Sequence, residues 1–186
     1  YVSPAFTVAS GVLCRPNSLR PYYCSSTGYY YVFYKSGNQI YYKNSTDGKT
    51  WSNPTSITTT MYSGSEASVA SIDDKVGIVW IDTSGYDRIK IGTFQSDGTI
   101  SWGSTSNINV YLGVTQVYIN VIKISDTRYW YYRYAFIYDG IAHSSNDGSS
   151  WTDDGYCIEK PGGTKQLAII PYDTATRITE IYACGS

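Results

Sequence analysis

Apolar and polar positions alternate in short runs along most of the chain, and Gly, Asp, Asn and Ser separate the runs. β-Branched and aromatic residues fill these runs, which is typical of antiparallel strands joined by hairpins. Residues 29–35 and 39–43 form one such pair around a turn at residues 36–38. No window shows a 3.6-residue apolar period with helix caps. The pattern therefore predicts an all-β chain.

One short motif, Ser-x-Asp-Gly-x-x-Trp, recurs along the chain. The first copy spans residues 45–51, the third spans residues 145–151, and a looser second copy at residues 96–102 has one extra residue before its Trp. The three aspartates lie 50 residues apart in the numbering. The motif residues are Ser45, Asp47, Gly48 and Trp51; Asp97, Gly98 and Trp102; and Ser145, Asp147, Gly148 and Trp151. This regular spacing indicates a repeat architecture.

Each repeat contains about four predicted strands, with the motif between the third and the fourth. In the third repeat the pattern places a strand over residues 129–138 and a turn at residues 139–140. Four-stranded units of about 50 residues around an axis are the blades of a β-propeller. We therefore expect residues 1–186 to form one small propeller domain.

The predicted propeller has four blades, because 186 residues hold just under four repeats. The blades cover roughly residues 18–60, 65–110, 115–160 and 164–186, and residues 1–13 complete the last of them. Joining the N-terminal and C-terminal strands closes the ring and removes an exposed sheet edge. The alternative is an open array of blades that a second chain completes.

The motif resembles the Asp-box repeat of sialidases and other secreted β-propellers, over roughly residues 28–158. In that family the box is a folding device. The resemblance implies that Asp47, Asp97 and Asp147 accept hydrogen bonds from backbone N–H groups of their own turns. It also implies that the box glycines supply positive φ and that the box tryptophans pack between blades.

Sialidase chemistry would need an arginine triad, a Tyr nucleophile with a Glu partner, and an Asp acid. The family's Arg-Ile-Pro signature is absent, because Arg20 is followed directly by Pro. Arg20, Arg128 and Arg177 are candidates for an axial ligand face, but bridging of turns is the favoured interpretation. The adjacent aspartates at 73–74 and 153–154 alternate faces and so do not form an acid/base pair. The sequence therefore predicts no catalytic residues and no enzyme.

Charge and composition exclude several other functions. The chain has 14 basic and 15 acidic residues and a net charge of −1, so it lacks the basic excess that binds nucleic acid. A single His cannot supply a multi-His metal site. No apolar stretch approaches the 18 residues of a membrane span. We expect no cofactor, no metal, no nucleic acid and no membrane segment.

The cysteines and the first residue suggest a compartment. The chain starts at Tyr1, as expected after removal of a secretory signal. Cys14, Cys24, Cys157 and Cys184 lie far apart without a Cys-x-x-Cys motif, which favours two disulfides over a metal site. Of the three possible pairings, the propeller topology favours Cys14–Cys24 and Cys157–Cys184. The sequence thus predicts a secreted, extracellular protein.

Tyrosine is unusually frequent, with 21 residues in a chain of which only 16% is charged. In runs such as residues 29–31 and 129–132, alternate side chains must point away from the core of their own sheet. Surface Tyr is enriched at protein interfaces and sugar-binding faces. We expect a non-catalytic, self-assembling structural subunit whose partner is itself. A glycan-binding propeller is the alternative, followed by a sialidase-like glycoside hydrolase. The overall profile is similar to the subunits of extracellular microbial nanotubes.

Overall fold

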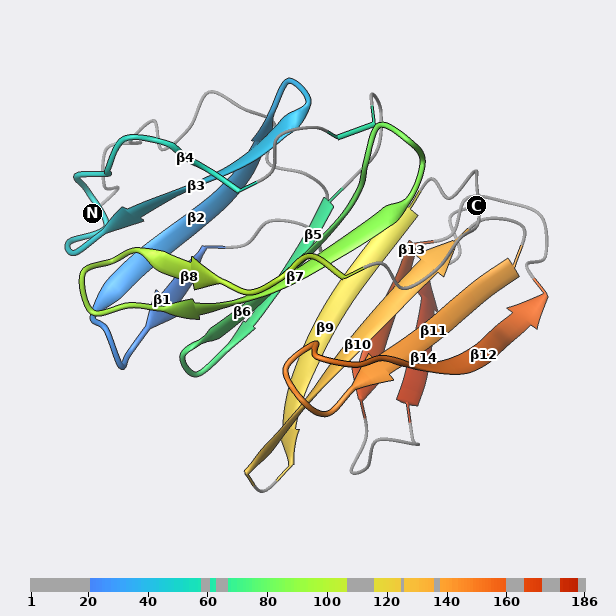
Figure 1. Ribbon diagram of the computed structural model, residues 1–186. Helices are drawn as coiled ribbons and strands as arrows, with labels where there is room; N and C mark the ends of the chain where they lie inside the picture. The colour runs from blue at the N-terminus through green and yellow to red at the C-terminus, as the bar shows by residue number, and fades with distance from the viewer. Residues whose placement is uncertain are drawn as a thin grey trace.

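The computed structural model describes residues 21–57, 61–62, 67–106, 116–124, 126–135, 138–159, 166–171 and 178–183. Over these residues the chain forms antiparallel strands and no helix, which confirms the prediction of an all-β fold. The strands form four sheets that follow one another along the chain (Figure 1).

Three of the sheets have four strands each. Sheet 1 comprises β1 (Tyr22–Cys24), β2 (Tyr29–Ser36), β3 (Gln39–Ser45) and β4 (Thr55–Ser56). Sheet 2 comprises β5 (Ala67–Ile72), β6 (Lys75–Ile81), β7 (Asp87–Phe94) and β8 (Ile100–Trp102). Sheet 3 comprises β9 (Gln116–Ile124), β10 (Thr127–Ala135), β11 (Tyr138–Ser144) and β12 (Thr152–Glu159). Within each sheet every strand pairs with the next in the chain, as in a propeller blade.

Sheet 4 has two described strands, β13 (Gln166–Pro171) and β14 (Ile178–Ala183). β13 lies next to β9, so sheet 4 follows sheet 3 in space as well as in sequence. Residues 1–13, which we expect to complete this sheet, lie outside the described residues. The closure of the ring and the count of four blades therefore stay predictions.

The hairpin turns of sheets 1 and 2 depend on residues with positive φ. Gly37 adopts φ 57° between β2 and β3, and Asp73 adopts φ 53° between β5 and β6. Tight hairpin turns favour Gly, Asn and Asp, because their backbone must enter the left-handed region. The polar pairs that interrupt the apolar runs thus set where these strands reverse.

The third sheet reverses earlier than the sequence suggests. The expected turn at Asp139 and Gly140 lies inside β11, where these residues pair with Ala135 and Tyr134 of β10. The pairing of β11 with β12 shifts register between Tyr138 and Gly140. Gly in a strand is often found at such an irregularity, because it tolerates close approach and unusual backbone angles. The Asp139-Gly140 pair therefore belongs to a strand, and the turn predicted at these residues is wrong.

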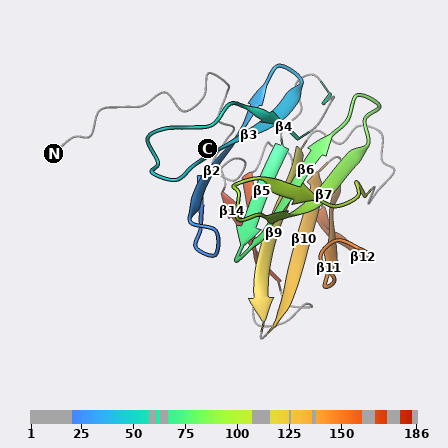
Figure 2. The ribbon, with the colours of Figure 1, turned by 60° about the vertical axis from the view of Figure 1, so that its left-hand side comes forward.

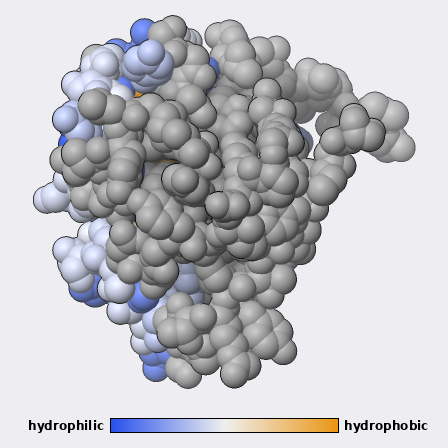
Figure 3. Space-filling view, turned by 90° about the vertical axis from the view of Figure 1, so that its right-hand side faces the viewer, coloured by the Kyte–Doolittle hydropathy of each residue, from blue (hydrophilic) through white to orange (hydrophobic). Residues whose placement is uncertain are grey.

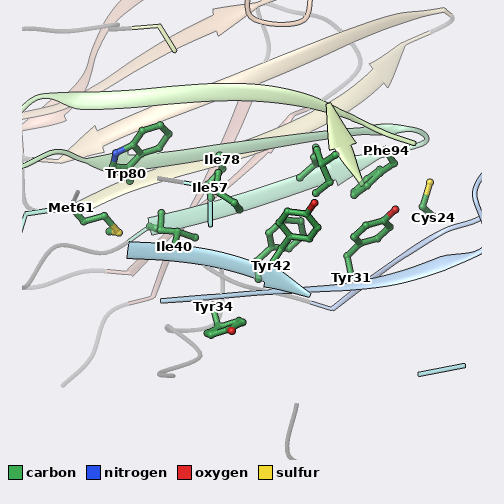
Figure 4. Close-up of a cluster of buried hydrophobic side chains, with 14 residues drawn as sticks. Cys24, Tyr31, Tyr34, Ile40, Tyr42, Ile57, Met61, Ile78, Trp80 and Phe94 are labelled. Atoms are coloured by element: carbon green, nitrogen blue, oxygen red, sulfur yellow. The ribbon is translucent and has the colours of Figure 1, made fainter. Parts of the chain in front are cut away.

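Sheets 1 and 2 share a core rich in aromatic side chains. Tyr31 and Tyr42 of sheet 1 point toward Ile78 and Phe94 of sheet 2 (Figure 4). The rings of Tyr31 and Phe94 are 4.3 Å apart at their centroids, and Tyr31 is fully buried. Part of the tyrosine surplus thus serves to pack one sheet against the next, because both faces of a blade need large side chains.

Sheets 2 and 3 pack along β5 and β9, which lie side by side (Figure 2). Trp130 of β10 is fully buried at this contact. It fits because Gly77 of β6 has no side chain: a Cβ there would lie 2.5 Å from Cζ3 of Trp130. The buried hydroxyl of Ser68 accepts a 3.2 Å hydrogen bond from the backbone N–H of Ile119. Shape and polar pairing both tie the two sheets together.

Candidate functional site

The first box turn is held by its own Asp. Oδ1 of Asp47 accepts hydrogen bonds from the backbone N–H groups of Lys49 and Thr50, each at 2.7 Å. The buried Ser45 hydroxyl donates to the same oxygen at 2.9 Å and accepts from the N–H of Gly48 at the same distance. These bonds, first of all the one from Thr50, lower the pKa of Asp47 to about 2. The turn therefore depends on an ionised carboxylate.

The second box turn connects sheet 2 to sheet 1. Oδ1 of Asp97 accepts from the backbone N–H of Thr99 at 2.9 Å and from the hydroxyl of the same residue at 2.6 Å. Gly98 has φ 83°, and a Cβ there would lie 2.7 Å from Cε1 of Tyr29 in sheet 1. Its carbonyl accepts a 2.7 Å hydrogen bond from Nδ2 of Asn44, also in sheet 1. The box is thus a contact between neighbouring sheets.

The third box turn is shifted by one residue from the expected register. Oδ1 of Asn146 accepts from the N–H of Ser150 at 3.0 Å and from the buried Ser144 hydroxyl at 2.9 Å. Asn146 and Ser144 therefore take the positions that Asp47 and Ser45 hold in the first turn. The turn-forming roles expected for Asp147 and Ser145 are wrong. Ser145 is exposed, and Asp147 has φ 52° and directs its carboxylate to side chains outside the turn.

The carboxylate of Asp147 does not stabilise the turn and instead binds side chains from sheets 2 and 3. Its Oδ1 accepts from Nε1 of Trp130 at 3.0 Å and from Nε of Arg128 at 3.2 Å. Nζ of Lys75 lies 3.9 Å from its Oδ2, and Nη1 of Arg128 also contacts Oδ1 of Asp74 at 3.1 Å. We refer to these five residues as the inter-sheet cluster.

The inter-sheet cluster keeps Asp147 ionised. Burial alone would raise the pKa of this carboxyl, but the hydrogen bonds from Trp130 and Arg128 more than offset burial and hold the pKa below its usual value. For Arg128, burial opposes the charged form, while Asp147 and Asp74 raise its pKa. The cluster is thus a compensated set of charges, with both ends of the ion pair satisfied.

The turn between β5 and β6 extends these contacts to sheet 1. The carboxylate of Asp73 pairs with Nζ of Lys123 in sheet 3 at 2.9 Å. Its backbone carbonyl accepts from the hydroxyl of Tyr22 in sheet 1 at 2.7 Å. Burial, followed by the nearby Cys24 and Asp73, raises the pKa of Tyr22 to about 12. From sequence, Asp73 and Asp74 looked like an ordinary turn, because nothing local shows which hairpins meet across sheets.

The described box tryptophans are half-buried. Trp102 packs against the core shared by sheets 1 and 2, and Trp151 packs against the core shared by sheets 2 and 3. Trp51 of the first box is also half-buried. Gly92 makes room for Trp102, because a Cβ there would lie 2.8 Å from its Cε3. These side chains thus support the sheets rather than line an open site.

Of the three candidate arginines, Arg128 is the one that lies within the described residues. Arg128 donates to Asp74 and Asp147 at the end of the sheets that carries the box turns. Arg20 and Arg177 lie outside the described residues. Arg128 therefore acts as a bridge between turns in this structure, since both of its carboxylate partners come from loops that join strands.

Cys24 is a free, buried thiol, so the expected Cys14–Cys24 disulfide is not formed. Its Sγ lies 3.2 Å from the Ser26 hydroxyl and 3.5 Å from the Asp73 carbonyl, so the thiol makes polar contacts instead of a disulfide. Cys14 and Cys184 lie outside the described residues, as does the side chain of Cys157. The pairing of Cys157 with Cys184 stays a prediction.

The described residues contain neither a cluster of metal-binding side chains nor a membrane-spanning helix. Among them, no three His, Cys, Asp or Glu side chains gather closely enough to hold a metal ion. Within the same residues, no helix is long and apolar enough to cross a membrane.

The described surface is mainly hydrophilic on the side shown in Figure 3. A shallow depression of about 340 Å³ lies between β7 and the third box turn. Its lining includes Ile89, Ile91, Ser104, Ser106 and the box residues 147–149. In the described part of the chain, the large apolar side chains that are exposed are all tyrosines: Tyr23, Tyr30 and Tyr62.

No protein-family model matches the chain, and no curated protein matches it by sequence. Solved structures do match. The NanB sialidase of Streptococcus pneumoniae, in complex with 2-[(3-chlorobenzyl)ammonio]ethanesulfonate, aligns with a TM-score of 0.54 and 17% identity over 90% of this chain. A point mutant of the same sialidase aligns with a TM-score of 0.53 and 15% identity over 83% of the chain. The chain has a β-propeller fold.

The propeller spans only part of the proteins it resembles. It covers 28% of the sialidase complex and 26% of the mutant. Zg3597, a family 117 glycoside hydrolase from the marine bacterium Zobellia galactanivorans, also aligns, with a TM-score of 0.46, 15% identity and coverage of 88% of this chain and 64% of that protein.

The comparison corrects the expectation that this chain is not an enzyme. That expectation relied on a missing sialidase signature, yet the chain shares its fold with a sialidase over most of its length. At this level of identity the likeness establishes the fold alone. The missing signature therefore does not exclude an activity on glycans.

Proposed function

We propose that this chain is an extracellular β-propeller subunit that assembles with further copies of itself through tyrosine-rich surfaces. The observation that supports this proposal is the exposure of Tyr23, Tyr30 and Tyr62, which are 50%, 39% and 54% exposed. The rings of Tyr23 and Tyr30 also contact each other, with centroids 4.7 Å apart. These two rings form an aromatic surface on sheet 1.

Two physical properties favour association through such a surface. Tyr offers a large contact area with few rotatable bonds, so ordering it in an interface costs little side-chain entropy. The net charge of −1 creates little long-range repulsion between copies. Contacts of this kind depend weakly on ionic strength, because ion pairs carry little of the contact energy.

Light scattering and negative-stain imaging across a salt series test this proposal. We expect concentration-dependent assemblies that persist when salt is raised. Tyr23→Ser combined with Tyr30→Ser should weaken assembly, and Thr55→Ser at an exposed position of β4 serves as the control. A protein that stays monomeric at high concentration would refute self-assembly.

Glycan binding is the second candidate. It is supported by the fold shared with a sialidase and by the depression beside the third box turn, where serine hydroxyls and Asp147 lie next to Ile89 and Ile91. A glycan array and a sialoside turnover assay on the same preparation test it. A hit that Ser106→Val removes, in a protein that does not assemble, would favour this function over the first.

A further inference from the structure

We propose that Tyr23 and Tyr30 form an oxidative crosslinking site, at which a dityrosine bond joins β1 to β2 within one copy of the chain. The co-substrate of this reaction is hydrogen peroxide, activated by a haem peroxidase. The link is independent of the proposed self-assembly, because both rings belong to one sheet of the same copy.

The two tyrosines face each other across the first hairpin of sheet 1. Tyr23 of β1 and Tyr30 of β2 are directly paired in the antiparallel ladder. Side chains of such a pair lie on the same side of the sheet, with Cβ atoms roughly 4.5–5.5 Å apart. Their ring centroids are 4.7 Å apart, and the ring planes are tilted by 39°. Strand pairing therefore holds the two phenols together, whatever lies over them.

The ring contact places carbon atoms close enough to react. Rings whose centroids are 4.7 Å apart have carbon atoms near van der Waals contact, roughly 3.5–4.0 Å. Reacting atoms in a productive arrangement lie about 3–3.5 Å apart, so a small rotation of one ring is sufficient. The other Tyr–Tyr contacts in sheet 1 have centroids 5.8 Å or 6.4 Å apart. Tyr23 and Tyr30 are therefore the best placed pair of this sheet for coupling.

The coupling is a two-electron oxidation of the pair. Each phenol gives up one electron and its hydroxyl proton, which leaves a phenoxyl radical with spin density on the ring carbons next to the oxygen. One Cε of each ring then combines with the other in a new carbon–carbon bond. Each bonded carbon transfers its hydrogen, as a proton, to the oxygen of its own ring and so restores the hydroxyl. The two electrons and two protons that leave the pair reduce one hydrogen peroxide to two waters.

A second cross-strand pair in the same sheet shows why the first is favoured. Tyr34 of β2 pairs with Tyr41 of β3, and their stacked rings have centroids 5.8 Å apart. Tyr34 is 4% exposed, and burial raises its pKa, so loss of its phenolic proton on oxidation is disfavoured. Tyr23 and Tyr30 are 50% and 39% exposed, so their protons can pass to water. Sheet 1 thus carries one pair suited to oxidation and one protected pair.

The thiol next to this pair is kept away from it. Thiols reduce phenoxyl radicals, so a cysteine in contact with the two rings would stop the coupling. Cys24 follows Tyr23 directly, and successive residues of a strand point to opposite faces. Its side chain is 0% exposed, with Sγ 3.2 Å from the Ser26 hydroxyl. The strand therefore separates the reducing group from the site of oxidation.

The link would brace a short strand. β1 pairs with β2 over three residues, and Tyr23 is the middle one. Cys24 is a free thiol, so no disulfide anchors β1 at this residue. A covalent bond between paired strands restricts the unfolded chain more than the folded one. The crosslinked protein should therefore melt a few degrees above the untreated protein.

Peptide mapping after treatment of the dilute protein with hydrogen peroxide and a haem peroxidase tests the proposal. Chymotrypsin cuts after Tyr29, between the two residues, so the link joins two peptides whose mass is two hydrogen atoms below their sum. Tyr23→Phe and Tyr30→Phe each remove one phenolic hydroxyl and keep the ring. Either variant should abolish this product while its melting temperature before oxidation stays near that of wild type. Tyr41→Phe, the matched change in the second pair, should leave the product at its wild-type yield.

The outcomes separate this site from the proposed function. A monomeric wild type that yields the product supports the site and refutes self-assembly alone. Absence of the product from oxidised wild type would overturn the site. An equal yield from the urea-unfolded chain would show that closeness in sequence, and not strand pairing, brings the rings together. A product that joins two copies and increases with protein concentration would assign the coupling to contacts between copies. An unchanged melting temperature after crosslinking would refute the brace.

Discussion

Nε1 of Trp130 donates a 3.0 Å hydrogen bond to Oδ1 of Asp147. Trp130 is buried between sheets 2 and 3, and Asp147 belongs to the third box turn, so this bond attaches the turn to the core. The bond is available because Asn146 holds the turn in place of Asp147. Because Ser144 and Asn146 form the turn, the carboxylate of Asp147 is available for a contact between sheets.

Asp147→Gly should reduce the free energy of unfolding by about 1–3 kcal/mol, because the buried Trp130 indole then lacks an acceptor. Glycine adopts a φ of 52° without strain, so the lost free energy of unfolding reflects removal of the carboxylate and not backbone strain. Asp147→Asn keeps one acceptor oxygen and should lose clearly less. Urea unfolding of the three proteins measures this, and equal losses for both variants would argue against the hydrogen bond.

Gly77→Ala should destabilise the contact between sheets 2 and 3 by about 1–3 kcal/mol through overpacking. A Cβ at this position would lie 2.5 Å from the fully buried Trp130, so the indole or the backbone would have to shift. Trp130→Leu creates space, so it should cost less in the Gly77→Ala background than in wild type. Chemical denaturation of the four proteins in this cycle measures the coupling. Additive losses would show that the two residues do not press on each other.

Acid should remove part of the stability through Asp47. Its pKa is lowered from 3.8 to about 2 in the folded protein, so its contribution is present above about pH 4 and is lost as the pH falls toward 2. Asp47→Asn should therefore be less stable than wild type at neutral pH, and the difference should shrink between pH 4 and 2. Thermal midpoints at several pH values check this. Asp126→Asn, in an exposed turn, controls for the loss of one carboxylate, and a pH-independent difference would contradict the prediction.

The Cys24 thiol should resist modification in the native protein. It is buried and lies against Ser26 and the Asp73 carbonyl. We expect alkylation of Cys24 only after denaturation, detected by peptide mass mapping without reduction. Cys24→Ser keeps a polar contact and should cost only a small part of the stability. A recovered peptide with Cys14 joined to Cys24 would contradict the free thiol.

Local patterns determined most of the secondary structure. The runs of β-branched and aromatic residues at 29–35 and 39–43 predicted strands that the structure contains as β2 and β3, because such side chains favour the extended backbone. The turn at residues 139–140 was wrong, because a Gly in a strand irregularity and a Gly in a turn have the same local signature. Sequence alone thus located the strands and misplaced one reversal.

The third box shows where sequence was ambiguous. Residues 144–148 read Ser-Ser-Asn-Asp-Gly, so two serines and two acceptor side chains fit the box in different registers. The pairing of Ser144 with Trp130 selects one register, and Arg128 and Trp130 then bind the carboxylate that is left over. Distant partners made this choice, and a local motif does not contain them.

Sequence by itself determined that this chain is a series of antiparallel sheets with box turns and many tyrosines, because periodicity and turn chemistry act over a few residues. Only the tertiary structure decided which of those tyrosines are buried. Tyr31 lies inside the core between sheets, while its neighbour Tyr30 remains exposed. Alternation assigns the two residues to opposite faces of β2, but whether a face is covered depends on sheets some 50 residues away in the chain.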